Sequence, residues 1–197
     1  MRLTTTWLAA ALTALAIAGA TSSFAFDLQG HRGARGLAPE NTLPAFERAL
    51  AIGVTTLELD IGVTSDGVVV VLHDPFLNPV ITRDAAGQWL SDTKGPLVRS
   101  LSLAQLQAYD VGRIRPDSAY AMTFATQQGR DGVRVPTLAA VFDRVKSLGA
   151  NHVRFNIETK LNPTRLDDTV TAEAMTRALL QVIAEAGMAQ RVAEIRS

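Results

Sequence analysis

The sequence predicts an α/β domain in which strands and helices alternate, and two observations predict it. Apolar runs of strand length alternate with segments of helical pattern, and the run at 68–72 is almost wholly β-branched, as in a strand buried on both faces. Four such runs end in polar clusters: His31-Arg32-Gly33, Glu58-Leu59-Asp60, His73-Asp74 and Glu158-Thr159-Lys160. Ordinary core strands do not end this way, because burying an unpaired charge is unfavourable unless a metal or counter-charge meets it.

Five segments have the composition of β-strands. The expected strands cover residues 26–30, 54–63, 68–72, 152–159 and the start of a fifth at 191–195. The first two, with a helix between them, indicate a βαβ unit. A tight turn at 64–67 joins the second strand to the third, and this step fits a hairpin equally well.

Three longer helices are expected between these strands, and each follows a residue suited to capping. They are 43–52 after Thr42, 138–148 after Thr137, and a segment opened by Asp167 or Asp168 that runs to 186. Between about 75 and 134 the pattern breaks down, and only 102–109 has a helical pattern. We interpret this stretch as an insertion after the third strand, of the length that more often serves function than packing.

The positions of the polar clusters fit two α/β architectures. Ligands bind at the carboxyl ends of the strands in a (β/α)8 barrel and also in a doubly wound sheet, so position alone does not choose between them. A (β/α)8 barrel takes about 250 residues, whereas this chain has 197. Five strands would leave such a barrel incomplete.

Composition excludes several classes of protein. Lys and Arg together number 19, as do Asp and Glu, and this balance argues against a nucleic-acid-binding protein. The chain has no cysteine, which excludes a disulfide framework and thiolate chemistry.

The first 25 residues have the pattern of a signal peptide. A positive start at Arg2 precedes an apolar run at 7–20, and 23–25 offers small residues where a signal peptidase cleaves, so we expect cleavage near Ala25. The run is short for a membrane span, which needs about 20 residues. We therefore expect a secreted or periplasmic protein without a stable membrane anchor, whose mature domain is 26–197.

Glu58 and Asp60 lie two residues apart in an expected strand, so both carboxylates project from one face. Alone, the pair also fits a solvated surface strand. Glu158 repeats the arrangement in the strand at 152–159, and three carboxylates converge if the two strands share a sheet. Clustered acids repel and need a cation, and hard oxygen ligands favour Ca²⁺ or Mg²⁺ over zinc.

His31 and His73 each directly follow an apolar run. A single histidine at such a place is more often structural, but two beside a candidate metal site favour catalysis. With ordinary pKa values of about 6.5, one can act as a base and the other as an acid near neutral pH. Asp74 either orients an imidazole or caps the following turn.

Arg32 and Lys160 supply positive charge beside these groups. Fixed cations stabilise the extra negative charge that develops in the transition state of a phosphodiester. The simpler reading of Lys160 is that it only neutralises Glu158.

Three further features look structural. The segment 33–36 is glycine-rich but matches neither a dinucleotide-binding fingerprint nor a Walker loop, so we read it as a tight turn. Glu40 and Asn41 read as helix-entry residues, and His152 begins its strand far from Lys160.

Read in order, the segments resemble the glycerophosphodiester phosphodiesterase family. The matching stretches are HRGARGLAPENTLPAFERAL, ELDIGVTSDGVVVVLHDPF, VRVPTLAAVFD and FNIETK, in a region from about 28 to 192. The resemblance implies a (β/α)8 barrel that hydrolyses glycerophosphodiesters to glycerol 3-phosphate and an alcohol with a divalent cation. It implies metal ligands at Glu58, Asp60 and Glu158, acid-base catalysis by His31 and His73, and phosphate contacts from Arg32 and Lys160.

The resemblance also implies that the segment 75–134 corresponds to the family's small inserted module over the active site. The family normally continues past the fifth strand, whereas this chain reads RVAEIRS there, so we expect a truncated form. Two alternatives remain open: a catalytically inactive fragment that binds metal or phosphate, and a phospholipase D-like or phosphoinositide-cleaving relative.

Overall fold

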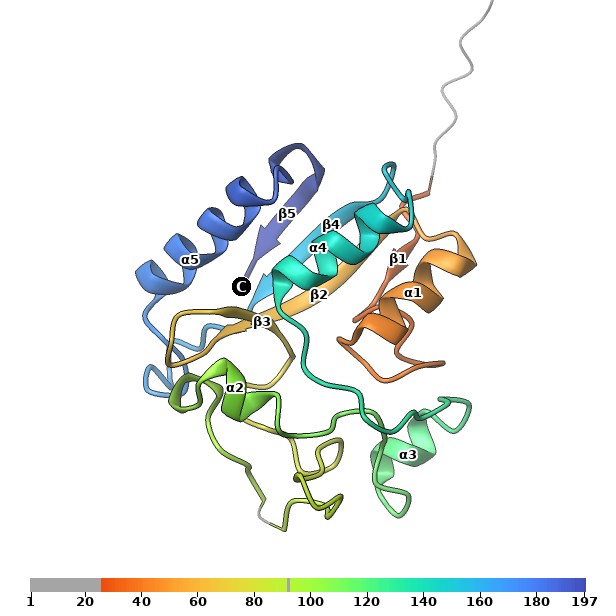
Figure 1. Cartoon of the computed structure of the whole chain (residues 1–197), viewed down its shortest axis with the longest axis vertical. Helices are drawn as coiled ribbons and strands as arrows, with labels where there is room; N and C mark the ends of the chain where they lie inside the picture. The colour runs from red at the N-terminus through yellow and green to blue at the C-terminus, as the bar shows by residue number, and fades with distance from the viewer. Residues whose placement is uncertain (1–25, 92) are drawn as a thin grey trace, which may run out of the picture.

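Strands and helices alternate along the chain in the computed structural model, which describes residues 26–91 and 93–197 (Figure 1). The sheet has five strands in the order β1-β2-β4-β5, with β3 paired to β2 off this path. Its parallel strands are β1 (Gln29–Gly30), β2 (Thr56–Val63), β4 (Arg154–Thr159) and β5 (Val192–Arg196). Neighbouring parallel strands need long crossover connections, and helices supply them here.

β3 (Val69–Val71) is the antiparallel partner of β2 and lies outside the parallel series. Ile61 pairs with Val71, so the turn at 64–67 closes a hairpin. Gly67, with φ 81°, supplies the left-handed residue of this turn. Of the two readings that the sequence allowed for this step, the hairpin is the observed one, and four strands rather than five run parallel.

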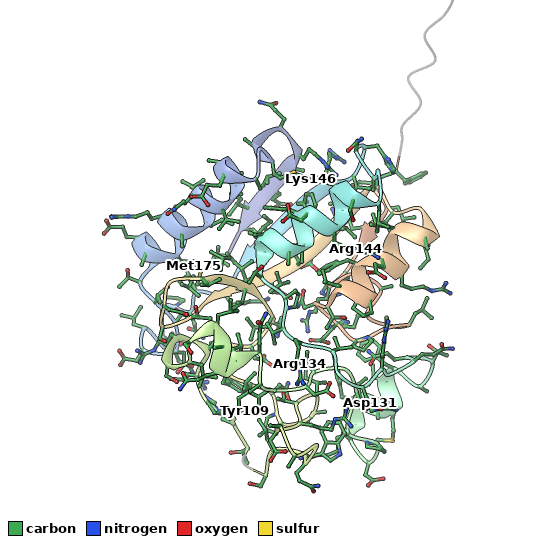
Figure 2. The ribbon with its side chains drawn as sticks, viewed as in Figure 1. Tyr109, Asp131, Arg134, Arg144, Lys146 and Met175 are labelled. Carbon is green, nitrogen blue, oxygen red and sulfur yellow. The ribbon has the colours of Figure 1, made fainter. Side chains whose placement is uncertain are left out.

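Three helices form the crossovers and cover one face of the sheet (Figure 1). They are α1 (Leu43–Ile52), α4 (Leu138–Ser147) and α5 (Ala172–Glu185). Their apolar faces share one buried cluster with Leu57, Leu59 and Ile61 of β2 and with Phe155 and Ile157 of β4. Met175 of α5, labelled in Figure 2, is fully buried in this cluster. This face of the sheet therefore provides the hydrophobic core.

A threonine side chain caps the amino end of each crossover helix. Thr42, Thr137 and Thr171 each accept a hydrogen bond from the backbone N–H three residues later. Such a cap satisfies a helix N–H that has no partner within the helix. The expected start of the third helix at 167 or 168 is wrong, because Thr171 rather than an aspartate caps it.

The inserted segment lies between β3 and α4, beyond the carboxyl ends of the parallel strands (Figure 1). It contains a 3₁₀ turn (Val98–Ser100), α2 (Leu103–Leu106) and α3 (Ala119–Thr123). Its own apolar cluster includes Leu77 and Leu106. The helix expected at 102–109 is only one turn long, and α3 was not expected from the sequence.

The remaining elements differ from the expectations mainly at their ends. β1 and β4 begin later than expected, at Gln29 and Arg154. The expected signal peptide, 1–25, lies outside the described residues. Among residues 26–91 and 93–197, no helix combines the length and the apolar composition that a bilayer span requires.

Candidate active site

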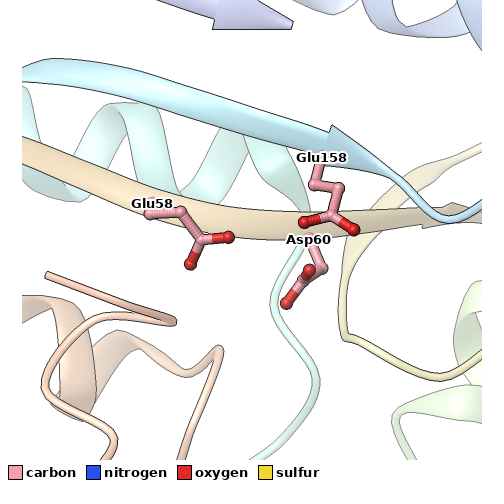
Figure 3. A group of neighbouring side chains, drawn as sticks. All are labelled: Glu58, Asp60 and Glu158. Atoms are coloured by element: carbon pink, nitrogen blue, oxygen red, sulfur yellow. The ribbon is translucent and has the colours of Figure 1, made fainter. Parts of the chain in front are cut away.

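Three carboxylates meet at the carboxyl ends of β2 and β4. Asp60 pairs with Glu158 across the parallel strands, and Glu58 lies two residues before Asp60 on the same face. One ligand oxygen from each of the three lies within 4.8 Å of the others (Figure 3). Glu58 and Asp60 are almost fully buried, at 2% and 1% exposure. Three acids at this separation repel one another strongly unless positive charge lies between or beside them.

Two cations contact the three carboxylates from the carboxyl ends of β4 and β5. Lys160 Nζ lies 2.9 Å from Asp60 Oδ1 and also pairs with Glu158. Arg196, at the end of β5, lies 3.2 Å from Glu58 and 3.3 Å from Glu158. Lys160 therefore does more than neutralise Glu158, because it reaches two of the three acids.

A third cation, Arg32, comes from the loop that follows β1. Its backbone N–H donates to Glu58 Oε2 at 2.8 Å, and its side-chain Nε lies 3.3 Å from Asp60 Oδ2. Its Nη1 donates to Glu40 Oε1 at 2.9 Å. Burial lowers the pKa of Arg32, but Glu40 and Asp60 outweigh this effect and hold the pKa above its usual value. Arg32 is thus a permanently charged link between the loop and the acids.

The loop 31–41 has a constrained backbone. Arg32 and Asn41 have φ values of 51° and 53°, in the left-handed region, which costs residues other than glycine about 1–3 kcal/mol and persists only where the surroundings hold it. Asn41 N–H donates to the carbonyl of Arg32 at 3.0 Å and closes the loop. Gly33 is required because a Cβ there would lie 2.7 Å from the backbone of Ala45 in α1.

Glu40 and Asn41 belong to the site, so the expectation that they only begin a helix is wrong. Asn41 Nδ2 donates to Asp60 Oδ2 at 2.8 Å, and its Oδ1 accepts from the backbone N–H of Asp60 at 3.4 Å. Glu40 is 9% exposed and accepts from Arg32. Because the loop turns back on itself, Asn41 reaches Asp60 directly and Glu40 reaches the acids through Arg32.

The two histidines have different partners. His31 Nδ1 lies 3.1 Å from Arg35 Nη2, and its Nε2 lies 3.8 Å from Glu58 Oε2. An arginine N–H only donates, so Nδ1 of His31 accepts and the proton of the neutral ring is on Nε2. Burial and the positive charge of Arg35 and Arg32 lower the pKa of His31, and Glu58 opposes them only in part.

His73 has the opposite arrangement. Its Nδ1 lies 2.9 Å from Asp74 Oδ1, and Asp74 also accepts from Asn78 at 2.8 Å. Burial raises the pKa of Asp74, but the hydrogen bonds from His73 and Asn78 outweigh it, so the carboxylate stays ionised and only accepts. The Nδ1 of His73 therefore donates, which leaves Nε2 free to accept a proton. Asp74 thus orients the ring, one of the two roles that the sequence allowed.

His73 lies near the three carboxylates because it follows β3 of the hairpin, not because it follows a parallel strand. The backbone N–H of Leu72 donates to the carbonyl of Asp60 at 3.0 Å, which places His73 just beyond that residue. Among the described residues, no ion pair joins His73 to the three acids, but it lines a cavity of about 30 Å³ together with Glu40 and Asn41. His152 is exposed before the amino end of β4, away from the site.

The residues fit a hard divalent cation. All three candidate ligands are carboxylates, the donors that Ca²⁺ and Mg²⁺ favour. Asp60 Oδ1 is buried and accepts no hydrogen bond within the described part of the chain, although Lys160 lies beside it. Lys160 lies 2.9 Å from this oxygen but outside hydrogen-bond geometry, and a cation among the three acids would complete its contacts.

Comparison with known proteins identifies similar sequences. The model of the "Glycerophosphoryl diester phosphodiesterase family" matches residues 31–196. A glycerophosphodiester phosphodiesterase of Bacillus subtilis is 34% identical over 130 residues, which is 66% of this chain and 38% of that protein. One from Caldanaerobacter subterraneus is 32% identical over 130 residues, 66% of this chain and 43% of that protein. The matched region thus spans less than half the length of these relatives.

Solved structures show the same fold. A Silicibacter pomeroyi protein assigned as a glycerophosphoryl diester phosphodiesterase is 34% identical, with a TM-score of 0.77 over 85% of this chain and 56% of that one. An Oleispira antarctica phosphodiesterase, solved with the product sn-glycerol-3-phosphate, is 25% identical, with a TM-score of 0.58 over 88% and 57%. The expected fold class is confirmed: the four parallel strands and their helices are part of a (β/α)8 barrel.

Proposed function

This chain belongs to the glycerophosphoryl diester phosphodiesterase family, and on that premise we propose that it hydrolyses glycerophosphodiesters to glycerol 3-phosphate and an alcohol with the help of a divalent cation. One observation carries the proposal: Glu58, Asp60 and Glu158 converge within 4.8 Å, with Arg32 and Lys160 in contact with them. The Oleispira enzyme's product, sn-glycerol-3-phosphate, supports a small phosphate ester as the substrate class.

The three carboxylates would hold the cation, Ca²⁺ or Mg²⁺. When bound, such an ion polarises a phosphoryl oxygen and neutralises charge that develops on it. Two of the acids are held in place for this role, because Asn41 donates to one Asp60 oxygen at 2.8 Å and the backbone N–H of Arg32 donates to one Glu58 oxygen at 2.8 Å.

Arg32 and Lys160 bind the phosphate group. Both side chains are partly open to solvent, at 12% and 18% exposure, while they contact the buried acids. With a cation held by the carboxylates these ion pairs would weaken, and both side chains would then be able to turn to the phosphate oxygens. Arginine offers a planar fork of N–H donors to these oxygens, and lysine a compact charge.

His73 acts as the base in the first step. Its free Nε2 takes the proton from the glycerol hydroxyl next to the phosphodiester, and that oxygen attacks phosphorus. His31 gives its Nε2 proton to the oxygen of the departing alcohol, and the P–O bond to that alcohol breaks. For this step His31 must first bind a second proton at Nδ1, so Arg35 must leave that nitrogen. The product of this step is a cyclic phosphodiester.

Water opens the ring in the second step with the roles reversed. His31, now neutral, takes a proton from the water that attacks phosphorus. His73 returns its proton to the ring oxygen as the P–O bond breaks, which yields glycerol 3-phosphate and restores the hydroxyl. His73 thus ends the cycle neutral, as it began, and His31 ends it doubly protonated, the state from which it donated in the first step.

Release of glycerol 3-phosphate from glycerophosphocholine by the whole chain tests the proposal, with Ca²⁺, with Mg²⁺ and with a chelator. We expect metal-dependent release that falls by about 10²- to 10⁴-fold in His31→Ala, the usual contribution of an acid-base group. His152→Ala is the matched control, because His152 lies at the opposite end of the sheet. Activity with the chelator contradicts the metal site. Binding of calcium and glycerol 3-phosphate without turnover instead supports a binding fragment.

We also propose that the protein is exported, as the pattern of residues 1–25 indicates. A fusion of these residues to a reporter that is active only outside the cytoplasm is expected to show activity. Loss of this activity when the apolar run at 7–20 is interrupted by charges would support the proposal, and activity that persists would contradict it.

A further inference from the structure

The inserted segment contacts the loop 31–41 at several points. Between 118 and 128 it donates three hydrogen bonds to loop carbonyls: Gln127 Nε2 to Arg35 at 2.7 Å, Thr126 Oγ1 to Gly36 at 3.0 Å, and Gln128 N–H to Leu37 at 3.0 Å. α3 lies next to the loop that follows β1 (Figure 1). These contacts join segments about ninety residues apart in sequence, so they form only in the folded protein.

Tyr120 of α3 connects to Arg32 through one carboxylate. The Tyr120 hydroxyl donates to Glu40 Oε2, and the other oxygen of Glu40 accepts from Arg32 Nη1 at 2.9 Å. Burial and the neighbouring Glu40 raise the pKa of Tyr120 above its usual range, so the hydroxyl keeps its proton at neutral pH. Since the Glu40 side chain is only 7% exposed, water cannot easily replace either partner.

Phe124 connects to His31 through Arg35. The Arg35 guanidinium lies 4.8 Å from the centre of the Phe124 ring, and Arg35 Nη2 lies 3.1 Å from His31 Nδ1. Tyr120 and Phe124 pack edge to face, with ring centres 4.8 Å apart. Two neighbouring rings therefore reach two neighbouring residues of the loop, each through one charged side chain.

We propose that Tyr120 and Phe124 are positioning residues of the active site: Tyr120 fixes Arg32 through Glu40, and Phe124 supports the Tyr120 ring and holds Arg35 beside His31 until His31 binds its second proton. The inference deepens the proposed function and relies on it for the roles of Arg32 and His31. The left-handed backbone of Arg32 makes such support necessary, because the loop does not hold this conformation on local preference. In this way the inserted segment sets the geometry of both groups without touching the substrate.

Two substitutions test the two connections. Tyr120→Phe keeps the ring but removes the hydroxyl that donates to Glu40. We expect about a 10-fold weaker affinity for sn-glycerol 3-phosphate in calorimetry, the size of one lost hydrogen bond to a charged group, and a KM increase of similar size with little change in kcat. Phe124→Leu removes the edge-to-face partner of Tyr120, and we expect it to raise KM about 2- to 10-fold with kcat nearly unchanged, because the packing that orients the Tyr120 hydroxyl is weakened.

Hydrogen exchange provides a readout that does not need turnover. Amides of residues 32–41 are expected to exchange several-fold faster in Tyr120→Phe, whereas those of β2 and α4 keep the wild-type rate. Tyr109→Phe is the matched control, because Tyr109 packs against the insertion's own apolar cluster, away from α3 (Figure 2). The double variant Glu40→Gln/Tyr120→Phe is expected to bind sn-glycerol 3-phosphate no more weakly than Glu40→Gln alone, because both substitutions affect Arg32 through the Glu40 side chain.

The outcomes separate this inference from the proposed function. If the wild type releases no glycerol 3-phosphate, the proposed function fails, and the exchange rates of 32–41 still decide the inference. Exchange and affinity equal to those of wild type in Tyr120→Phe would overturn it. An equal loss of affinity in Tyr109→Phe would also overturn it. So would a fall in the global stability of Tyr120→Phe large enough to explain both the faster exchange and the weaker affinity.

Discussion

The two faces of β2 and β4 are built from alternate residues of the same strands, yet one face forms the core and the other forms the candidate site. On one face Leu57, Leu59 and Ile157 are fully buried beneath the crossover helices. On the other face Glu58 and Asp60 are equally buried but surrounded by cations and by polar groups of the loop 31–41. Burial is therefore not what distinguishes core from site in this protein; the partners of each side chain are.

This difference separates stability from chemistry within a single strand. The apolar face gains free energy from every methylene that it removes from water. The polar face gathers three acids whose mutual repulsion must be compensated, which is a poor arrangement for stability and a good one for binding a cation. Substitutions of neighbouring residues on opposite faces should therefore have opposite consequences.

The largest effect is expected for Glu58→Gln on the polar face. The amide keeps the volume and an oxygen that accepts from the backbone N–H of Arg32, but it removes one charge from the ligand set. Calcium affinity measured by calorimetry is expected to fall by more than about 100-fold, beyond the upper range for residues that only support a ligand. The melting temperature is expected to move by less than about 4 °C. A large fall in melting temperature with unchanged calcium affinity would show that Glu58 contributes to stability rather than to metal binding.

The next effect is expected for Leu59→Ala on the apolar face. Leu59 is fully buried against the crossover helices, so its truncation leaves a cavity and should lower the free energy of unfolding by about 2–5 kcal/mol. Denaturant unfolding measures this change. Calcium affinity is expected to stay within about 2-fold of wild type where the variant is folded. Ile157→Val is a milder companion, with an expected cost of about 0.5–1.5 kcal/mol.

The smallest effect concerns the amino end of the polar face. Asp27 accepts from Thr56 at 2.6 Å, and this hydrogen bond is the main cause that lowers the pKa of Asp27 from 3.8 to about 2. Burial opposes it, and the hydrogen bonds from Gln29 and Thr55 and the charge of Arg154 add to it. Because the pKa in the folded state is the lower one, the stabilisation is complete above pH 3.8 and is lost as the pH falls through about 2.

Asp27→Asn should remove the part of the pH dependence of stability that comes from this carboxyl group. The change is expected to be less than about 1 kcal/mol, because Asp27 is exposed and solvent screens its interactions. Unfolding curves of wild type and variant should converge near pH 2 and separate above pH 4. Calcium affinity at neutral pH should not change, since Asp27 lies at the opposite end of β2 from the acids. Curves that stay parallel throughout would show that Asp27 has no such role.

Much of the site could be predicted from local patterns. The spacing of Glu58 and Asp60 placed both on one face of a strand, and the positions of His31, His73 and Lys160 after apolar runs placed them at one edge of the sheet. Glu40, Asn41, Tyr120 and Arg196 were missed. The left-handed turn at Asn41 and the tyrosine hydroxyl have no periodic signal, and Arg196 showed only as a polar residue at the end of an expected strand.

The sequence by itself determined the order of strands and helices, the apolar and polar faces of β2 and β4, and the acidic, basic and imidazole groups at the strand ends. These are local properties, because side chains repeat their direction every two residues in a strand and every 3.6 residues in a helix, so neighbouring positions in the sequence reveal them. Only the tertiary structure decided that β3 turns back as a hairpin, that Asp60 lies beside Glu158, and that α3 reaches the loop 31–41. The last two contacts join residues 80 or more positions apart, and all three depend on how whole elements pack.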